Sequence, residues 1–165
     1  MPASMSSSRK RFLTEKNRAH ILIQPRLRLL RRRLLAIDGE EVVLGRSGEL
    51  ELLLARAEVW RRVTPRKIAG EINQCHKNTA RTYLKSPSKH RIVTGWVLHG
   101  DDVVWRQHSW LLRKNELCET TFPAKVYYGV ILDETEAACF VRAELGGAAS
   151  STAPDPPATK RKRST

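Results

Sequence analysis

Apolar residues recur three or four positions apart in parts of the chain, which is the spacing of one face of a helix. In residues 49–63 the apolar positions are Leu50, Leu53, Leu54, Ala57 and Trp60. Acidic residues lie near the start of this stretch and arginines near its end, as the helix dipole favours. We therefore predict an amphipathic helix over residues 49–63, which the following Thr-Pro sequence ends.

A second helix is predicted over residues 75–85, where a Ser-Pro-Ser sequence follows and stops it. Its inward-facing positions would be Ala80, Tyr83 and Leu84. Asn73 is a candidate N-cap, because its side-chain oxygen can accept a hydrogen bond from a free amide at a helix start. This arrangement places Cys75 in the first turn of the helix.

Strand-like runs fill much of the remaining chain. The predicted strands are residues 41–44, 91–98, 103–112, 117–121 and 124–132, with turns at 99–102 and 114–115. Residues 134–145 fit either a closing helix or a further strand. Since helices come first and a meander of strands follows, we predict an α+β domain with N-terminal helices packed on an antiparallel sheet.

The net charge of +13 at pH 7 lies almost entirely at the two ends of the chain. Residues 1–33 hold ten Lys and Arg against one acid, whereas the part between the two ends is nearly neutral. We expect one domain between two tails, because 165 residues are about one domain's worth of chain and the Ala, Ser, Thr and Pro composition of the C-terminus is typical of disorder. The expected parts are a basic, largely disordered or partly helical extension over residues 1–35, one α+β domain over 36–147, and a disordered basic tail over 148–165.

The arginines of the N-terminal extension allow three interpretations. The first is a solvated, partly helical segment that Pro25 interrupts. The second is a contact with nucleic acid or an anionic surface, because clustered arginines bind phosphates by releasing counterions. The residues concerned would be Arg28, Arg31, Arg32 and Arg33. The third is an organelle transit segment, and in a eukaryotic source the basic cluster at residues 160–163 would instead favour the nucleus.

The cysteine pattern and hydropathy narrow the class of protein. Three widely spaced cysteines without a CxxC pair argue against a disulfide framework and favour a reducing, cytoplasmic compartment. No apolar run reaches the roughly 18 residues that a membrane helix needs, so we expect no membrane span. We expect no cofactor and no metal. The alternative is an unpatterned zinc site made of Cys75, His76, His108 and Cys118.

Cys75 is the candidate nucleophile. A helix N-terminus lowers the pKa of a thiol, because free amides and the helix dipole favour the thiolate. The same region, with Asn73 and Gln74, would bind substrate or hold a developing oxyanion. The alternative is that Cys75 is a small buried apolar residue, as free cysteine often is.

A histidine and a glutamate are predicted to meet in a later hairpin. If residues 114–115 form a tight turn, Arg113 faces Glu116 across the ladder. His108 and Glu119 are then diagonal neighbours on one face, close enough for the carboxylate to orient the imidazole. The alternative for this pair is an ordinary cross-strand ion pair.

Two further residues lie beside these candidates. Trp110 shares the face of His108 and would form a wall of a substrate groove, with core packing as the alternative. His76 follows Cys75 directly, and adjacent helical residues point about 100° apart. We therefore expect His76 to be a helix-surface residue rather than a base.

The order of these motifs resembles the transglutaminase-like branch of the papain-like cysteine enzymes. The motifs are a helix that begins with Cys75, then His108-Ser109-Trp110 and Glu119-Thr120-Thr121, with Gly95 ahead of the histidine strand. Glu119 stands where the family usually has Asp, and His76 stands where it usually has an aromatic residue. The resemblance implies a papain-like core and a Cys-His-Glu triad. It also implies hydrolase or acyltransferase chemistry on an amide or ester bond, as in a thiol protease, a deamidase or an acyl-transfer enzyme.

Such an enzyme would act on a short peptide or a small amide or ester, because the part of the chain between the basic ends leaves room only for a small groove. A rival hypothesis is a non-catalytic nucleic-acid-binding protein that uses its basic termini. A third is an interaction protein that keeps the fold without the activity.

Overall fold

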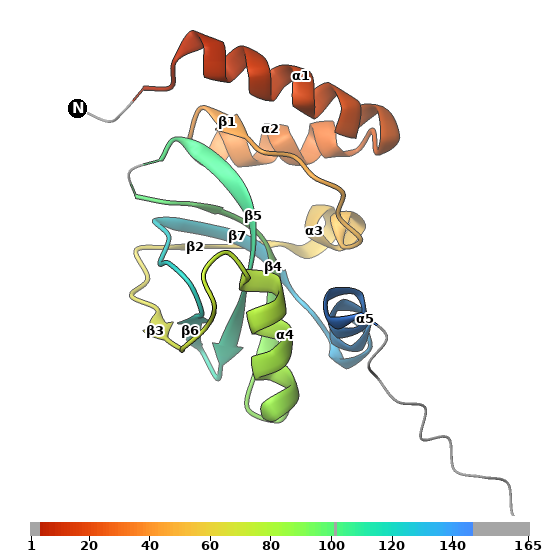
Figure 1. Ribbon diagram of the computed structural model, residues 1–165, viewed down its shortest axis with the longest axis vertical. Coiled ribbons are helices and arrows are strands. Elements are labelled where there is room, and N and C mark those ends of the chain that lie inside the picture. Colours follow the sequence, from red (N-terminus) through yellow and green to blue (C-terminus); the bar gives the residue numbers. More distant parts are fainter. Residues whose placement is uncertain (1–3, 101, 147–165) are drawn as a thin grey trace, which may run out of the picture.

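A curled sheet of seven strands forms the centre of the structure, a computed structural model that describes residues 4–100 and 102–146 (Figure 1). The strands are β1 (Glu41–Val42), β2 (Glu58–Arg61), β3 (Arg66–Lys67), β4 (Arg91–Leu98), β5 (Val104–Arg113), β6 (Glu116–Glu119) and β7 (Val126–Ile131). Their order is β2-β7-β4-β5-β6-β3, and β1 pairs with β5 outside this path. The pairs β1–β5 and β3–β6 are parallel and the others antiparallel. The α+β class is confirmed, but the expected antiparallel sheet is mixed.

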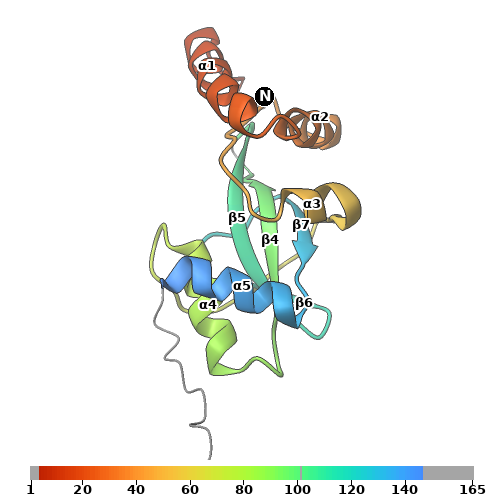
Figure 2. The same cartoon turned by 90° about the vertical axis from the view of Figure 1, so that its right-hand side faces the viewer.

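Five helices surround the sheet within the described residues. They are α1 (Ser7–Ile23), α2 (Leu27–Ile37), α3 (Leu50–Arg56), α4 (Cys75–Lys85) and α5 (Glu134–Leu145). In Figures 1 and 2 the helices α1 and α2 lie together at one end of the molecule, while α4 and α5 lie side by side at the other. The sheet runs between the two helix pairs and connects them.

Two apolar clusters lie on the two sides of the central strands. The larger cluster joins helices α2 to α5 to one face of the sheet. The smaller cluster consists of Val93, Val97, Trp110, Leu112, Leu117 and Tyr127. Because successive residues of a strand point to opposite faces, His108 lies on the side of the smaller cluster and Ser109 on the side of the larger one. Strand β5 therefore presents functional side chains to both faces.

Most predicted elements occur where the sequence indicated them. The helix over residues 75–85 is α4, and the predicted strands correspond to β1, β4, β5, β6 and β7. The ambiguous stretch at 134–145 is the helix α5. Its start has a capping box, in which Asp133 accepts from the amide of Glu136 at 2.8 Å and Glu136 accepts from the amide of Asp133 at 2.8 Å.

The helix predicted over residues 49–63 is wrong in its second half. α3 ends at Arg56, and the following residues form β2, which pairs antiparallel with β7. Trp60, which fitted the helical spacing, instead packs edge-on against Trp110, with ring centroids 5.7 Å apart. The free edge of β7 supplies backbone partners to a Glu-Val-Trp-Arg sequence that also suits a strand, so tertiary pairing outweighs the local helical pattern.

The N-terminal region is helical, and its second helix belongs to the core. α1 ends before Pro25 and α2 begins after it, as predicted. Three leucines of α2 are fully buried in the larger cluster: Leu27, Leu30 and Leu34. Residues 27–37 therefore pack with the domain instead of extending from it. The predicted tail at 148–165 lies outside the described residues. None of the helices that the structure describes combines the length and apolar composition needed to cross a membrane.

Candidate active site

The segment that leads to Cys75 is hydrogen-bonded to β6, the strand that carries Glu119. Lys67 of β3 pairs with Glu119 of β6, and the amide of Ile68 donates to the carbonyl of Glu119 at 2.8 Å. Gly70 then passes so close to β6 that a Cβ there would lie 2.5 Å from the carbonyl oxygen of Thr120. Only glycine fits such a close backbone approach. The parallel β3–β6 pair thus brings the start of α4 beside the β5–β6 hairpin.

α4 begins with Cys75, so the cysteine lies in the first turn as predicted, but Asn73 is not the cap. The cap position belongs to Gln74, whose side chain makes no capping bond, and Asn73 precedes it with φ 61°. The buried Asn78 instead holds the loop: it accepts from the amide of Glu71 at 3.1 Å and donates to the carbonyl of Glu71 at 2.7 Å. The first helical hydrogen bond runs from the amide of Asn78 to Gln74. The amides at the start of α4, including that of Cys75, are therefore not used by the helix itself.

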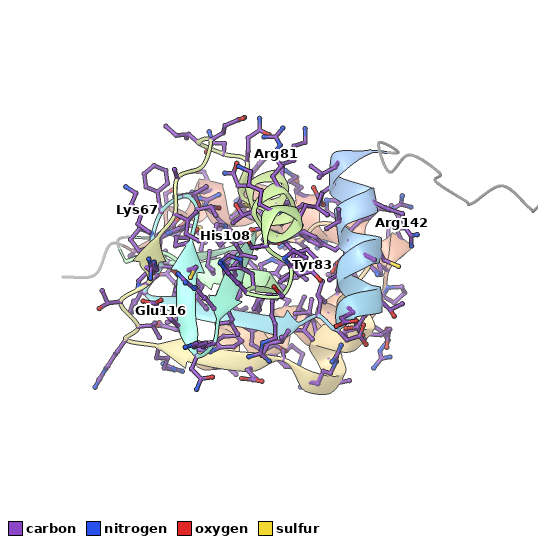
Figure 3. All side chains as sticks on the ribbon, turned by 90° about the horizontal axis from the view of Figure 1, so that it is seen from below. Lys67, Arg81, Tyr83, His108, Glu116 and Arg142 are labelled. Carbon is purple, nitrogen blue, oxygen red and sulfur yellow. The ribbon has the colours of Figure 1, made fainter. Side chains whose placement is uncertain are left out.

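The β5–β6 hairpin has the register that the tight turn predicted, with Arg113 opposite Glu116. His108 and Glu119 meet on one face. The Nε2 atom of His108 lies 3.1 Å from Oε1 and 3.0 Å from Oε2 of Glu119. Both side chains are almost fully buried. In the view of Figure 3, His108 lies between α4 and the strand that carries Glu116.

The carboxylate of Glu119 is fully hydrogen-bonded. Besides His108, its donors are the amides of Thr120 and Thr121, the hydroxyl of Thr121, and the hydroxyl of Tyr127 at 3.3 Å. Burial alone would raise the pKa of Glu119, but the hydrogen bond and charge of His108 and the bonds from Thr121 hold that pKa below its ordinary value. Glu119 therefore remains an ionised acceptor behind the imidazole.

Cys75 and His108 form an acid–base pair. Burial disfavours the thiolate, but hydrogen bonds from His108 and His76 and their positive charges outweigh it and lower the pKa of Cys75 to about 5. Burial likewise disfavours the imidazolium of His108, but the thiolate and Glu119 raise its pKa to about 9. Because Nε2 faces Glu119, Nδ1 is the nitrogen that remains for the thiol. At pH values between these two, a thiolate on Cys75 and an imidazolium on His108 are the favoured forms.

His76 does not lie on the helix surface, so that prediction is wrong. Its Nδ1 atom is 2.6 Å from the hydroxyl oxygen of Ser109, and its ring packs edge-on against Phe140 of α5 at 6.2 Å between centroids. His76 lies in the first turn of α4, which is close enough to β5 for its side chain to reach the strand. The sequence signal that could have predicted this contact was Ser109, because a residue that follows His108 in a strand points to the opposite face, where α4 packs.

Trp110 cannot wall a substrate groove, because no part of it is exposed. Its ring stacks on that of His108, with centroids 6.2 Å apart and 19° between the planes. Trp60 and Tyr127 pack edge-on against the same indole. Trp110 therefore supports the imidazole from behind, and the alternative of core packing is the correct one.

Two of the four arginines predicted to contact nucleic acid have partners inside the domain. Arg31 donates from Nε and Nη2 to the buried carboxylate of Glu41, at 2.6 and 2.7 Å, and Arg33 donates to the carbonyl of Leu54. Burial raises the pKa of Glu41, but the hydrogen bonds from Arg31 and from the amide of Val42, together with the charge of Arg31, outweigh burial and leave this pKa lowered. Arg28 and Arg32 are exposed on α2. Of the four, Arg31 is the one whose guanidinium is paired with a buried carboxylate.

The zinc alternative does not fit the arrangement. Cys118 packs in the larger apolar cluster, while His108 faces the other side of the sheet. Within residues 4–100 and 102–146 no group of three or more His, Cys, Asp or Glu side chains is placed to hold a metal ion.

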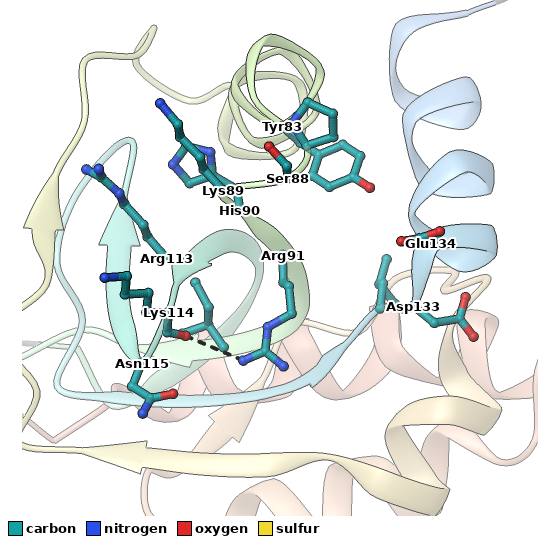
Figure 4. A pocket seen from close by; sticks show the side chains of 13 residues that line it. Tyr83, Ser88, Lys89, His90, Arg91, Arg113, Lys114, Asn115, Asp133 and Glu134 are labelled. Atoms are coloured by element: carbon teal, nitrogen blue, oxygen red, sulfur yellow. Dashed lines mark hydrogen bonds between the residues drawn. The ribbon is translucent and has the colours of Figure 1, made fainter.

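A cavity of about 1150 Å³ lies away from these residues (Figure 4). It is bounded by the end of α4, the start of β4, the β5–β6 turn and the start of α5. Its charged lining side chains are Lys89, Arg91, Arg113, Lys114, Asp133 and Glu134. None of Cys75, His108 and Glu119 lines it.

Comparisons of the chain with protein families, curated proteins and solved structures found no match.

Proposed function

We propose that this protein is a cysteine-dependent acyl-transfer enzyme, a hydrolase or acyltransferase that cleaves an amide or ester through Cys75, His108 and Glu119. The observation that carries the proposal is the buried His108–Glu119 pair beside Cys75 at the start of α4, where His108 and His76 lower the pKa of Cys75 to about 5. The order of a cysteine at a helix start followed by strands with histidine and acid also supports a papain-like core of the transglutaminase-like type.

In this mechanism the thiolate of Cys75 attacks the carbonyl carbon and forms a tetrahedral intermediate. The free amide of Cys75, with Gln74 beside it, stabilises the oxyanion. His108 then gives its proton to the leaving amine or alcohol, and an acyl thioester on Cys75 remains. Water or an amine attacks the thioester while His108 takes its proton. Glu119 holds the Nε2–H of His108 throughout and so keeps Nδ1 directed at the reacting atoms.

Two exposed apolar side chains suggest how substrate is held. Ile72 lies three residues before Cys75 and is 69% exposed, and Phe122 follows Thr121 and is 56% exposed. The two loops that carry them meet where Gly70 packs on Thr120. They would contact an apolar part of a short peptide or small ester, which is the substrate size we propose.

Alkylation by iodoacetamide tests the proposed thiolate. At pH 6 a thiol with a pKa of about 5 is mostly ionised, whereas an ordinary thiol with a pKa of about 8.5 is not. A thiolate of lower pKa is also a weaker nucleophile, with a Brønsted coefficient of about 0.4–0.5. Cys75 should therefore react about tenfold faster than an ordinary exposed thiol at pH 6. This advantage should vanish by about pH 7–8, where the ordinary thiol ionises as well. Peptide-resolved mass spectrometry measures both rates in one sample.

The exposed Cys139 is the internal comparison, and Cys75→Ala is the control that identifies the labelled site. A rate for Cys75 at pH 6 that does not exceed that of Cys139 contradicts the proposed function.

The alternative function, binding of nucleic acid or an anionic surface through the basic termini, can be tested at the exposed Arg28 and Arg32. Deleting the N-terminal extension (residues 1–35) would also remove the core leucines of α2. A loss of binding could then come from a loss of folding. The double variant Arg28→Gln/Arg32→Gln should instead lower the salt dependence of duplex DNA binding, with the slope of log K against log salt reduced by about two. Unchanged binding would show that Arg28 and Arg32 do not contact the nucleic acid.

A further inference from the structure

The ring of His76 has a fixed orientation. The hydroxyl of Ser109 donates to the hydroxyl oxygen of Thr94 at 3.0 Å, and both residues are buried. With its proton directed at Thr94, the Ser109 oxygen accepts from the Nδ1–H of His76 at 2.6 Å. The Nε2 atom is therefore the nitrogen of His76 that remains for another partner.

That partner is the neighbouring thiol. Cys75 and His76 are consecutive at the start of α4, and His108 and Ser109 are consecutive in β5, where they point to opposite faces. His76 bonds Ser109 on one face of β5, and His108 points to the other face, so the start of α4 lies beside both residues. Both imidazoles act on the sulfur of Cys75 and lower its pKa.

The groups around His76 come from four elements. Its neighbour on α4 is Cys75, and β5 contributes His108 and Ser109. Thr94 of β4 acts on it through Ser109. Helix α5 contributes Phe140 and Glu144. Burial and the positive charge of His108 lower the pKa of His76, whereas the hydrogen bond and charge of Cys75 and the charge of Glu144 raise it, and the net change is upward. His76 thus favours its protonated form while Cys75 is a thiolate.

We propose that His76 is a second catalytic histidine, which donates a hydrogen bond from Nε2 to the thiolate of Cys75 and is held in place by Ser109 and Thr94. This proposal rests on the proposed function and adds a role to it. His108, with a carboxylate behind it, moves the proton of the reaction. His76, with only hydroxyls behind it, keeps the sulfur ionised at low pH and so sets the acid limit of activity.

The pH profile of Cys75 alkylation in the full chain tests the proposal. In the His76→Gln variant the lower midpoint of the profile should move upward by about one pH unit, because the thiolate loses one charged donor. The alkylation rate at pH 5 should then fall by about fivefold, while the rate at pH 8 does not fall. Ser109→Ala should shift the midpoint in the same direction by a smaller amount, since His76 remains but loses its anchor.

His90→Gln is the matched control, because His90 lies between α4 and β4, where it bonds the carbonyl of Ser86. A His76→Gln profile that superimposes on wild type overturns the proposal. Circular dichroism reports whether each variant folds, and Ser109→Ala decides the question if His76→Gln does not fold. Failure of the proposed function looks different: wild type itself would then lack a midpoint near pH 5.

Discussion

The His108→Ala variant should form an acyl-enzyme that it cannot efficiently hydrolyse. Acetylation of Cys75 by p-nitrophenyl acetate needs only a thiolate, which a mildly basic pH supplies even without the charge of His108, but removal of the acetyl group needs a base to activate water. Positioned acid–base groups contribute roughly 10²- to 10⁴-fold to such steps, and we expect deacylation to slow by that factor. Mass spectrometry of the intact chain, followed over time after the ester is removed, measures the rate.

The same experiment separates the role of the carboxylate. Glu119→Gln keeps a hydrogen-bond acceptor beside His108 but removes the charge that stabilises the imidazolium. Its deacylation should be slower than that of wild type and faster than that of His108→Ala. His90→Ala is the control for a histidine outside the site. Wild-type deacylation in His108→Ala would remove His108 from the mechanism.

Replacement of Gly95 by alanine should cost more stability than any surface change. Gly95 lies opposite His108 in β5 and opposite Gly129 in β7. A Cβ at Gly95 would lie 2.0 Å from the carbonyl oxygen of Tyr128 and 2.6 Å from the Cα of Gly129, which are backbone atoms of a central strand. Because no side-chain rotation relieves such a clash, we expect the free energy of unfolding to fall by at least about 3 kcal/mol.

Denaturant titration followed by circular dichroism measures this loss, and failure to fold at all would be its extreme form. Gly48→Ala is the matched control, because a Cβ there has no atom within 4 Å. A loss below about 1 kcal/mol in Gly95→Ala, within the range of ordinary substitutions, would mean that the strands β4 and β7 can separate locally.

The parts of the site that could be predicted from the sequence are those set by local rules. A two-residue turn fixes the register of a hairpin, and the register fixes which residues share a face, so the contact of His108 with Glu119 followed from residues 114–115. The end of α4 followed from the Ser-Pro-Ser sequence after it. These signals act over a few residues and do not depend on the rest of the fold.

The parts that could not be predicted depend on long-range packing. Trp60 satisfies a helical spacing, and only the presence of β7 makes a strand better there. The burial of Trp110 depends on Trp60 and Tyr127, which approach it from other strands. His76 reaches Ser109 only because the β3–β6 pair positions the start of α4. In each case a distant segment determines the outcome.

The stacking of Trp110 on His108 gives the site its own optical signal. An imidazolium in contact with an excited indole quenches its fluorescence by accepting an electron, which a neutral imidazole does poorly. The pair is also within the distance at which a cation and a tryptophan face interact. Emission from Trp110 should therefore brighten as pH rises through about 9, where His108 loses its proton. The protonation of the imidazole can then be followed without any added label.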